Sequence, residues 1–196
     1  AKPFLWQSDT SVMRNSWCYS KRADYKETRE ILWDLIDVVS KNGRLLLNFG
    51  PKPDGTLADK DVEILRAMGD WMKVNDEAIH GTGLWLLAQE GPTVIEEGGF
   101  SDGKPRVFTS EDFRFTCRGD QVYAIAMACP EDGVLKIRSL RADGEDHKAP
   151  CHSLVRKVEV LGLERPLKWT RDTEALTVDL GDYRTDLPLT VRITVV

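Results

Sequence analysis

Two kinds of hydrophobic pattern follow one another along the chain, and the change comes near residue 80. Before that point, apolar residues recur at helical spacing in two stretches, Ile31–Val39 and Val62–Met72, which predicts two amphipathic helices. Between them lies the continuous apolar run Arg44–Phe49. A run of this length predicts a strand buried on both faces, as in a parallel sheet. The first part of the chain therefore has the alternating order of an α/β unit.

Cap and turn residues mark the ends of these elements. Asp24 and Glu27 fit a capping box, in which Asp24 caps the first helix and Glu27 reaches back. Asn42-Gly43 is expected to end that helix, because glycine tolerates the left-handed conformation of a helix carboxyl end. The run 50–55 contains two prolines and two glycines, which predicts a loop after the strand. Thr56 is then expected to cap the second helix.

The second part of the chain contains short strand candidates separated by turn residues. In the stretch Phe113–Cys117 every second residue is apolar, which is typical of a strand. Seven such candidates at regular spacing predict an antiparallel β-sandwich. They cover residues 84–89, 113–118, 122–128, 135–139, 155–161, 176–180 and 189–195.

The α/β part is too small to form an ordinary fold alone. One buried parallel strand needs neighbours on both sides, and a complete (β/α)₈ barrel takes about 250 residues. We therefore expect two units, an incomplete α/β segment over residues 1–80 and an antiparallel β-sandwich domain over residues 81–196. Either the rest of the sheet lies on another chain, or this chain closes its sheet by association.

Composition excludes several classes of function. The 196 residues include 27 basic and 32 acidic ones, for a net charge of −5, so nucleic acid is not an expected partner. No apolar stretch approaches the roughly 20 residues of a membrane span. The four cysteines form no Cys-x-x-Cys pair and only three histidines are present, so no metal site is expected. The redox compartment and the localisation stay open.

Several motifs in order along the chain resemble those of family 29 glycoside hydrolases, the α-L-fucosidases. The longest runs from Val38 to Pro51 and continues to Asp54-Gly55. Ser16-Trp17-Cys18-Tyr19 is similar to the Ser-Trp-Gly-Tyr of that family, with cysteine at the glycine position. Further similar stretches are Gly69–Met72, Asn75–Thr82, Phe108-Thr109 and Asp112–Thr116.

The resemblance implies a retaining hydrolase that removes terminal α-L-fucose from glycans. It also implies that residues 1–80 are a partial, truncated (β/α)₈-type barrel segment, the end of a catalytic domain that precedes the β-sandwich. The expected partner is a fucosylated glycan or another fucoside, together with a second copy of the chain or a missing amino-terminal barrel half. No cofactor is implied, because the reaction uses carboxyl groups and water.

Two carboxyl groups perform this chemistry in a retaining glycosidase. The resemblance implies an aspartate nucleophile on a mid-barrel strand, and the sequence holds no segment that matches it. The family's acid/base is often a glutamate after a tryptophan, and the matching position here is Trp6-Gln7. An amide cannot deliver a proton to the leaving oxygen. Asp9 lies two residues on, on the same side of a strand as Gln7. It is a candidate acid/base, or an aspartate that bonds only to local backbone.

Three more residues are substrate-binding candidates beside Trp6 and Gln7. Trp17 and Tyr19 lie in a loop-like stretch, where an aromatic ring can stack on a sugar. Trp17 could equally be a core residue that covers the end of a barrel. Asn48 ends the buried strand, where barrel active sites are built. It is either functional or an anchor for the 50–55 loop.

Three functions stay open on the sequence alone. The chain is a truncated α-L-fucosidase-type hydrolase that assembles a site by association, a catalytically incomplete fragment, or a carbohydrate-binding or interaction module without activity of its own. The missing nucleophile segment favours the last two. The Ser16–Tyr19 and Asn48–Gly55 stretches favour the first two, because a binding sandwich alone would not need them.

Overall fold

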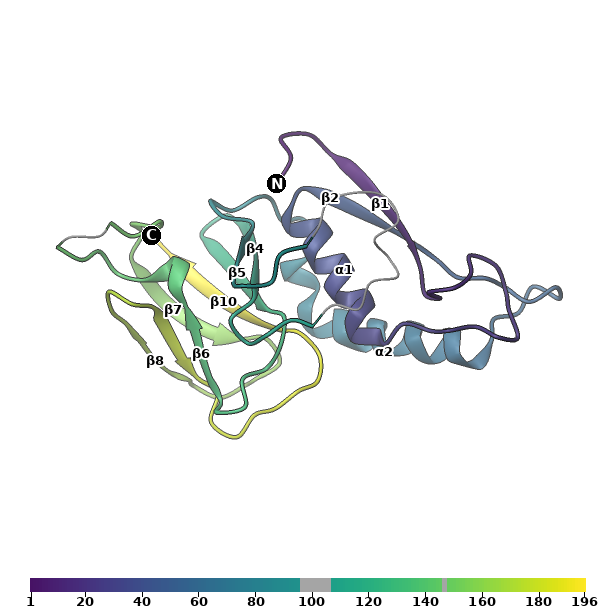
Figure 1. Cartoon of the computed structure of the whole chain (residues 1–196). Helices are drawn as coiled ribbons and strands as arrows, with labels where there is room; N and C mark the ends of the chain where they lie inside the picture. The colour runs from purple at the N-terminus through teal and green to yellow at the C-terminus, as the bar shows by residue number, and fades with distance from the viewer. Residues whose placement is uncertain (96–106, 146–147) are drawn as a thin grey trace.

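The computed structural model describes residues 1–95, 107–145 and 148–196, and it contains an α/β part beside a β domain (Figure 1). In the α/β part, β1 (Trp6–Ser11) and β2 (Gly43–Asn48) pair in parallel, with Trp6 opposite Gly43 and Ser11 opposite Asn48. The helix α1 (Thr28–Ser40) connects them. The helix α2 (Asp59–Asn75) follows and continues into the short 3₁₀ helix η1 (Asp76–Ala78). None of the helices in the described ranges is long and apolar enough to cross a membrane.

The cap of α1 is Glu27, three residues later in the chain than the predicted cap at Asp24. Glu27 is the residue before its first turn, and the backbone N–H of Glu27 donates to the Glu30 carboxylate at 2.7 Å. This is the reciprocal half of a capping box one turn further along the chain. Asp24 is outside the helix, where its carboxylate lies 3.9 Å from the Arg14 guanidinium. The box was predicted from the right residue types in the wrong register.

The end of α1 also differs from the prediction. Asn42 has the positive φ of 71°, whereas Gly43 is already the first residue of β2. Asparagine tolerates the left-handed conformation because its short side chain can bond locally. Gly43 is required for a different reason, because a Cβ atom there would lie 2.7 Å from the Trp6 ring and 2.7 Å from Val38.

The predicted cap of α2 at Thr56 is wrong as well. The helix begins after Ala58, whose backbone N–H donates to the buried Asp61 carboxylate at 3.2 Å. The Thr56 hydroxyl instead donates to Asp54 at 2.7 Å, within the turn that precedes the helix. Its partner is thus the turn aspartate, a common arrangement for aspartate side chains in loops.

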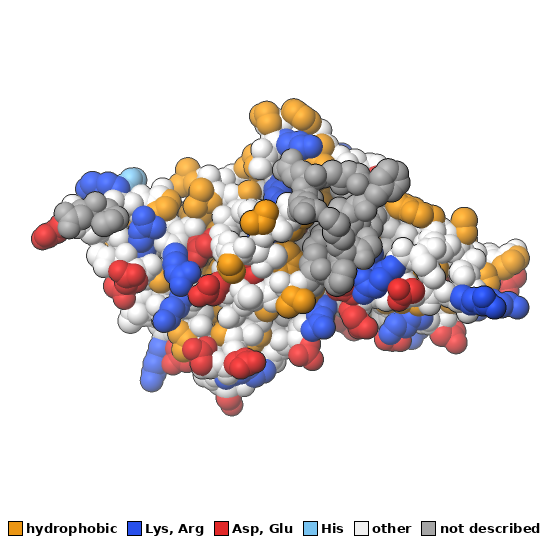
Figure 2. Space-filling view, in the orientation of Figure 1, with side chains coloured by type: hydrophobic (Ala, Val, Ile, Leu, Met, Phe, Trp, Pro, Cys, Tyr) orange, Lys and Arg blue, Asp and Glu red, His pale blue; other side chains and the backbone are white. Residues whose placement is uncertain are grey.

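The strand β2 is parallel as expected, but it is not buried on both faces. Its residues alternate, and Leu46 is 52% exposed on the face away from α1. The sheet has only two strands, so β1 and β2 each keep one unpaired edge within the described chain. Hydrophobic side chains also gather over the amino-terminal loop before β1 (Figure 2), where Phe4 and Leu5 are exposed. The apolar run Arg44–Phe49 therefore includes a side chain, Leu46, on a sheet face that the described residues leave uncovered.

The β domain consists of two antiparallel sheets over one core. The sheets have the strand orders β3-β4-β5-β10-β7 and β6-β9-β8. Side chains from both sheets form a single apolar cluster that includes Phe115, Ile137, Val178 and Val191. The strands are β3 (Gln89–Glu90), β4 (Phe113–Arg118), β5 (Gln121–Ala126), β6 (Val134–Ile137), β7 (Val155–Val160), β8 (Lys168–Arg171), β9 (Leu176–Asp179) and β10 (Leu189–Val195), with the 3₁₀ helix η2 (Arg138–Leu140) after β6.

Two strand predictions need correction. The stretch 84–89 contributes only the start of the two-residue strand β3, because the chain before it is held by a single bridge between Gly83 and Cys117. The strand β8 was not predicted, because Lys168–Arg171 has charged residues at both ends and a single large apolar residue, Trp169. It is an edge strand, where charged side chains are tolerated.

The helices pack on the outer face of the five-stranded sheet. Trp33 of α1 donates its indole N–H to the Met127 carbonyl at 2.7 Å, and Trp71 of α2 donates to the Pro188 carbonyl at 2.7 Å. One apolar cluster joins these helices to Ile125 and its neighbours on β5. The contact fixes the α/β part on the β domain, and the division of the chain near residue 80 stays a prediction.

Candidate functional site

The open face of the two-stranded sheet carries the candidate acid/base. Side chains alternate across a strand, and the parallel register places Gln7 beside Arg44 and Asp9 beside Leu46. All four side chains are exposed, on the face away from α1. The Gln7 amide donates to the Asp9 carboxylate at 2.8 Å. Gln7 and Asp9 therefore lie together, as their two-residue spacing predicts.

Trp6 is on the opposite face and does not join them. Its indole N–H donates to the Lys41 carbonyl at 3.0 Å, and the Lys2 ammonium lies 4.9 Å from the centre of its ring. The ring also fills the space that a side chain on Gly43 would need. These contacts fix the start of β1 against the end of α1, so the geometry assigns Trp6 a packing role rather than a place beside Asp9.

Two of the family-like motifs, Ser16–Tyr19 and the run that contains Asn48, meet at the carboxyl ends of the strands. The Ser11 hydroxyl donates to the Ser16 carbonyl at 3.0 Å, and the Asn48 amide donates to the Trp17 carbonyl at 2.7 Å. The Asn48 amide also lies 3.4 Å from the Ser11 hydroxyl. Asn48 thus has the anchoring role that was one of its two interpretations, although it holds the Ser16–Tyr19 segment rather than the 50–55 loop.

Gly50 is needed for the same close approach. A Cβ atom there would lie 2.5 Å from the Tyr19 nitrogen and 2.6 Å from the Cys18 carbonyl carbon. The backbone of the segment therefore packs directly on the start of the 50–55 loop. Trp17, held by this arrangement, is 51% exposed, which favours a ligand-facing role over a place in the core. Tyr19 is half-buried beside it.

The edge formed in this way suits binding better than complete catalysis. Exposed aromatic and planar polar side chains are what a sugar ring contacts, and the Trp17 ring and the Gln7–Asp9 pair supply both. A retaining glycosidase needs two carboxyl groups about 5 Å apart. Among the residues of β1 and β2, Asp9 is the single carboxylate. The second carboxyl group must then come from outside these two strands.

Sequence reasoning missed a buried lysine behind this sheet. Lys26 is 3% exposed, and its ammonium donates to the Thr10 hydroxyl at 2.6 Å and lies 3.5 Å from the Asp34 carboxylate. Thr10 and Asp9 are neighbours on β1 that face opposite sides. Lys26 therefore helps to fix the strand that carries Asp9. Lysine is rarely buried, and nothing in the sequence around Lys26 marks it as an exception.

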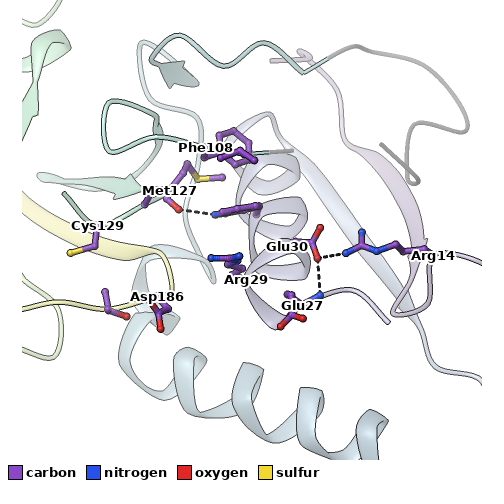
Figure 3. Close-up of a pocket in the computed structure, with 12 residues that line it drawn as sticks. Arg14, Glu27, Arg29, Glu30, Phe108, Met127, Cys129 and Asp186 are labelled. Atoms are coloured by element: carbon purple, nitrogen blue, oxygen red, sulfur yellow. Dashed lines mark hydrogen bonds and ion pairs between the residues drawn. The ribbon is translucent and has the colours of Figure 1, made fainter. Parts of the chain in front are cut away.

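A cavity of about 390 Å³ at the junction of the two parts was missed as well (Figure 3). At its edge, the Arg14 guanidinium donates to the Glu30 carboxylate at 2.5 Å. Partial burial acts to raise the pKa of Glu30, but hydrogen bonds from Arg14 and from the Glu27 backbone outweigh it, so this pKa is lowered. The pair therefore stays ionised at neutral pH. The residues around the cavity come from five separate segments, which no single sequence motif connects.

Comparison with known proteins gives one consistent family. The family model "Alpha-L-fucosidase" matches residues 1–77, and "Alpha-L-fucosidase C-terminal domain" matches residues 108–194. Tissue alpha-L-fucosidase of Homo sapiens is 31% identical over 172 residues, which are 86% of this chain and 31% of that protein. Plasma alpha-L-fucosidase of Rattus norvegicus is 32% identical over 174 residues, which are 86% of this chain and 32% of that protein.

Solved structures agree on the fold. The alpha-fucosidase of Thermotoga maritima in complex with fucose superposes with a TM-score of 0.73 at 22% identity, over 98% of this chain and 40% of the other. Alpha-L-fucosidase isoenzyme 1 from Paenibacillus thiaminolyticus gives a TM-score of 0.71 at 22% identity, over 100% and 41%. The chain thus spans about a third of the length of the curated relatives it matches. It belongs to the α-L-fucosidase family, and the part of the family that it represents includes the carboxy-terminal domain.

Proposed function

We propose that this chain takes part in the hydrolysis of terminal α-L-fucose from glycans, as one portion of a retaining α-L-fucosidase site. The single observation that carries the proposal is the open β1–β2 face, which bears Asp9 and ends beside the anchored Ser16–Tyr19 segment. The family match supports the substrate class. In this interpretation the unit β1-α1-β2-α2 is a segment of a (β/α)₈-type barrel.

The unpaired strand edges indicate which part of the site is still missing. Both strands have an unpaired edge in the described chain, and such edges pair readily with another strand. The relatives are about three times longer than the stretch that matches this chain. We propose that the remaining α/β portion of such an enzyme occupies these edges and supplies the nucleophile. Self-association of this chain is the alternative, and it would bring a second Asp9 rather than a new carboxylate segment.

In this proposal Asp9 acts as the acid/base. A carboxylic acid at this position would protonate the leaving oxygen and then accept a proton from the attacking water. The Gln7 amide donates to Asp9 at 2.8 Å and so orients its carboxyl group on the open face. Trp17 and Tyr19 would contact the sugar, and Asn48 would hold their segment in place.

The first test is the turnover of an aryl α-L-fucoside by the purified chain over a wide range of protein concentration. Completion by a separate polypeptide predicts no turnover by the chain alone, whereas self-association predicts a rate per chain that rises with concentration. Asp9→Asn removes the proton donor and keeps the shape of the side chain. The matched control is Asp70→Asn, an exposed residue of α2 that pairs with Lys73. In any assembly of the chain that turns over the fucoside, equal activity with the parent and with Asp9→Asn would contradict the role of Asp9.

One observation favours a second candidate, a carbohydrate-binding module without activity. Asp9 is the single carboxylate on β1 and β2, and its described partner is an amide. Binding of L-fucose by the chain alone, without turnover in any assembly, would support this function. Loss of that binding in Trp17→Ala would place it at the same edge.

A further inference from the structure

The cavity between α1 and the β domain has an apolar floor. Its floor includes the Trp33 and Phe108 rings, which meet edge to face with ring centres 5.0 Å apart and an interplanar angle of 70°. Met127 lies beside them, and its carbonyl accepts the indole N–H of Trp33 (Figure 3). The volume of about 390 Å³ lies in the range of about 300–1,000 Å³ that small-molecule sites occupy, and junctions between domains are a common place for them.

The walls carry polar groups with free hydrogen-bonding capacity. Arg29 of α1 holds its guanidinium 5.8 Å from the centre of the Trp33 ring, and Asp186 comes from the loop before β10 (Figure 3). Among the described residues, neither side chain has a hydrogen bond or an ion pair with another side chain. A planar donor and a planar acceptor that line one apolar floor are suited to the vicinal hydroxyls of a sugar.

The lining of the cavity carries charges of both signs. Two arginines face three carboxylates, those of Glu27, Glu30 and Asp186. Arg14 and Glu30 already neutralise each other at 2.5 Å. An anion would meet the remaining carboxylates, and a cation would meet Arg29. A neutral polyhydroxylated molecule can use both kinds of group, because each of its hydroxyls can donate and accept a hydrogen bond.

The cavity shares a loop with the open face of β1 and β2. Arg14 at the cavity belongs to the segment between β1 and α1, and its backbone N–H donates to the Asp24 carbonyl at 2.7 Å. The same segment carries Ser16–Tyr19, which Asn48 holds at the strand ends. A ligand in the cavity would therefore contact the base of the loop whose tip carries Trp17.

We propose that this cavity binds a neutral sugar residue of the glycan that bears the fucose, a proposal that rests on the function proposed above. The apolar floor of Trp33 and Phe108 receives the ring, Arg29 donates to the hydroxyls, and Asp186 accepts from them. The fucose then sits at the β1–β2 edge, and the rest of the glycan gains a second contact on the same chain.

The test measures saturation transfer by NMR from the chain to lactose and to N-acetyllactosamine, two neutral disaccharides, with L-fucose run separately. We expect transfer to a disaccharide, and at least about tenfold weaker binding in Arg29→Ala and in Asp186→Asn. The matched control for the second variant is Asp182→Asn, a fully exposed aspartate four residues earlier in the chain. Circular dichroism confirms that the variants, all changed at exposed residues, stay folded.

Three outcomes overturn the inference: no transfer to either disaccharide, equal transfer in parent and Arg29→Ala, or an equal loss in Asp182→Asn and Asp186→Asn. Stronger transfer to an amino-group cation such as glucosamine than to the neutral disaccharides would also overturn it. The proposed function is judged apart, by turnover of an aryl α-L-fucoside, which has no sugar beyond the fucose to occupy the cavity. Disaccharide binding without turnover in any assembly would leave this inference standing and refute hydrolysis.

Discussion

Removal of the Asp37 carboxylate should loosen the attachment of α1 to the β domain. Arg114 of β4 is 1% exposed, and its guanidinium donates to Asp37 of α1 at 2.5 Å. The Lys41 ammonium holds the other carboxylate oxygen at 2.8 Å. Arg114 also donates to the Phe113 carbonyl and lies 5.3 Å from the Phe108 ring centre. The charge of Arg114 thus depends on one carboxylate 77 residues away.

The size of the effect follows from the burial. Asp37→Ala leaves the Arg114 charge buried without its partner, which costs about 3–5 kcal/mol in comparable pairs. The free energy of unfolding of an ordinary domain is about 5–15 kcal/mol. The variant should therefore lose a large share of its free energy of unfolding. Alanine is also the best helix former, so the helix itself gains slightly rather than loses. The measured loss therefore belongs to the ion pairs that Asp37 forms with Arg114 and Lys41.

Urea unfolding, followed by circular dichroism and by tryptophan fluorescence, measures this loss. Trp33 and Trp71 lie at the junction and report on it, whereas circular dichroism reports on the whole chain. Asp70→Ala is the matched control, because its pair with Lys73 is exposed and should contribute less than about 1 kcal/mol. An Asp37→Ala loss below about 1 kcal/mol would refute the reasoning. In the double variant Asp37→Ala/Arg114→Met, part of the loss should be recovered, because no buried charge remains.

Three further changes test other parts of the fold. Gly43→Ala should destabilise the chain by about 1–3 kcal/mol in urea unfolding, because its Cβ atom would lie 2.7 Å from Trp6. Burial acts to raise the pKa of Asp112, but four hydrogen bonds from Thr93 and Thr109 outweigh it and lower this pKa. The stability that ionised Asp112 contributes is therefore complete above the pKa of the unfolded state, about 4, and is lost as the pH falls through the lower pKa of the folded state. Unfolding curves measured over a series of pH values should show a smaller loss of stability in acid for Asp112→Asn than for the parent. Arg171→Met should lower the melting temperature, with a loss of about 2–4 kcal/mol in the free energy of unfolding, because its guanidinium donates to four backbone carbonyls at the two ends of the connection between η2 and β7.

The strands with clear alternation were predictable from the sequence. The predicted ranges 113–118 and 189–195 match β4 and β10 residue for residue. Both strands pair on two sides in the middle of a sheet, and their alternate apolar residues face the core between the two sheets. The edge strand β8 has no such constraint, and its sequence Lys168–Arg171 shows no alternation.

Helix ends were less predictable, because several residues offer the same chemistry within one turn. Asp24 and Glu27 have the right types for a capping box, but Glu27 and Glu30 form it. The competing partner was Arg14, which attracts both Asp24 and Glu30 from the preceding loop. Which carboxylate caps the helix is decided by a tertiary contact that periodicity does not contain.

The candidate site was predictable in part. Strand alternation correctly put Gln7 and Asp9 side by side. The contact between Asn48 and the Ser16–Tyr19 segment was not predicted, because Asn48 and Trp17 lie 31 residues apart in sequence. The role of Trp6 was not predictable, because it depends on the space above Gly43. The cavity was not predictable either, because its lining residues come from separate segments. Arg14, Arg29 and Asp186 line one cavity only after the helices pack on the β domain.

The most direct test of the proposed function combines this chain with the portion of a relative that it lacks. This chain matches 31% of human tissue alpha-L-fucosidase. The complement is the α/β part of that protein outside the matched region. The two polypeptides are coexpressed, their complex is isolated by gel filtration, and its turnover of an aryl α-L-fucoside is measured beside that of the Asp9→Asn complex. We predict that the isolated complex turns over the fucoside and that Asp9→Asn reduces the rate by at least about a hundredfold, the contribution of a general acid. A stable complex without turnover, or one that is equally active with Asp9→Asn, would contradict the proposal that this chain carries part of a fucosidase site.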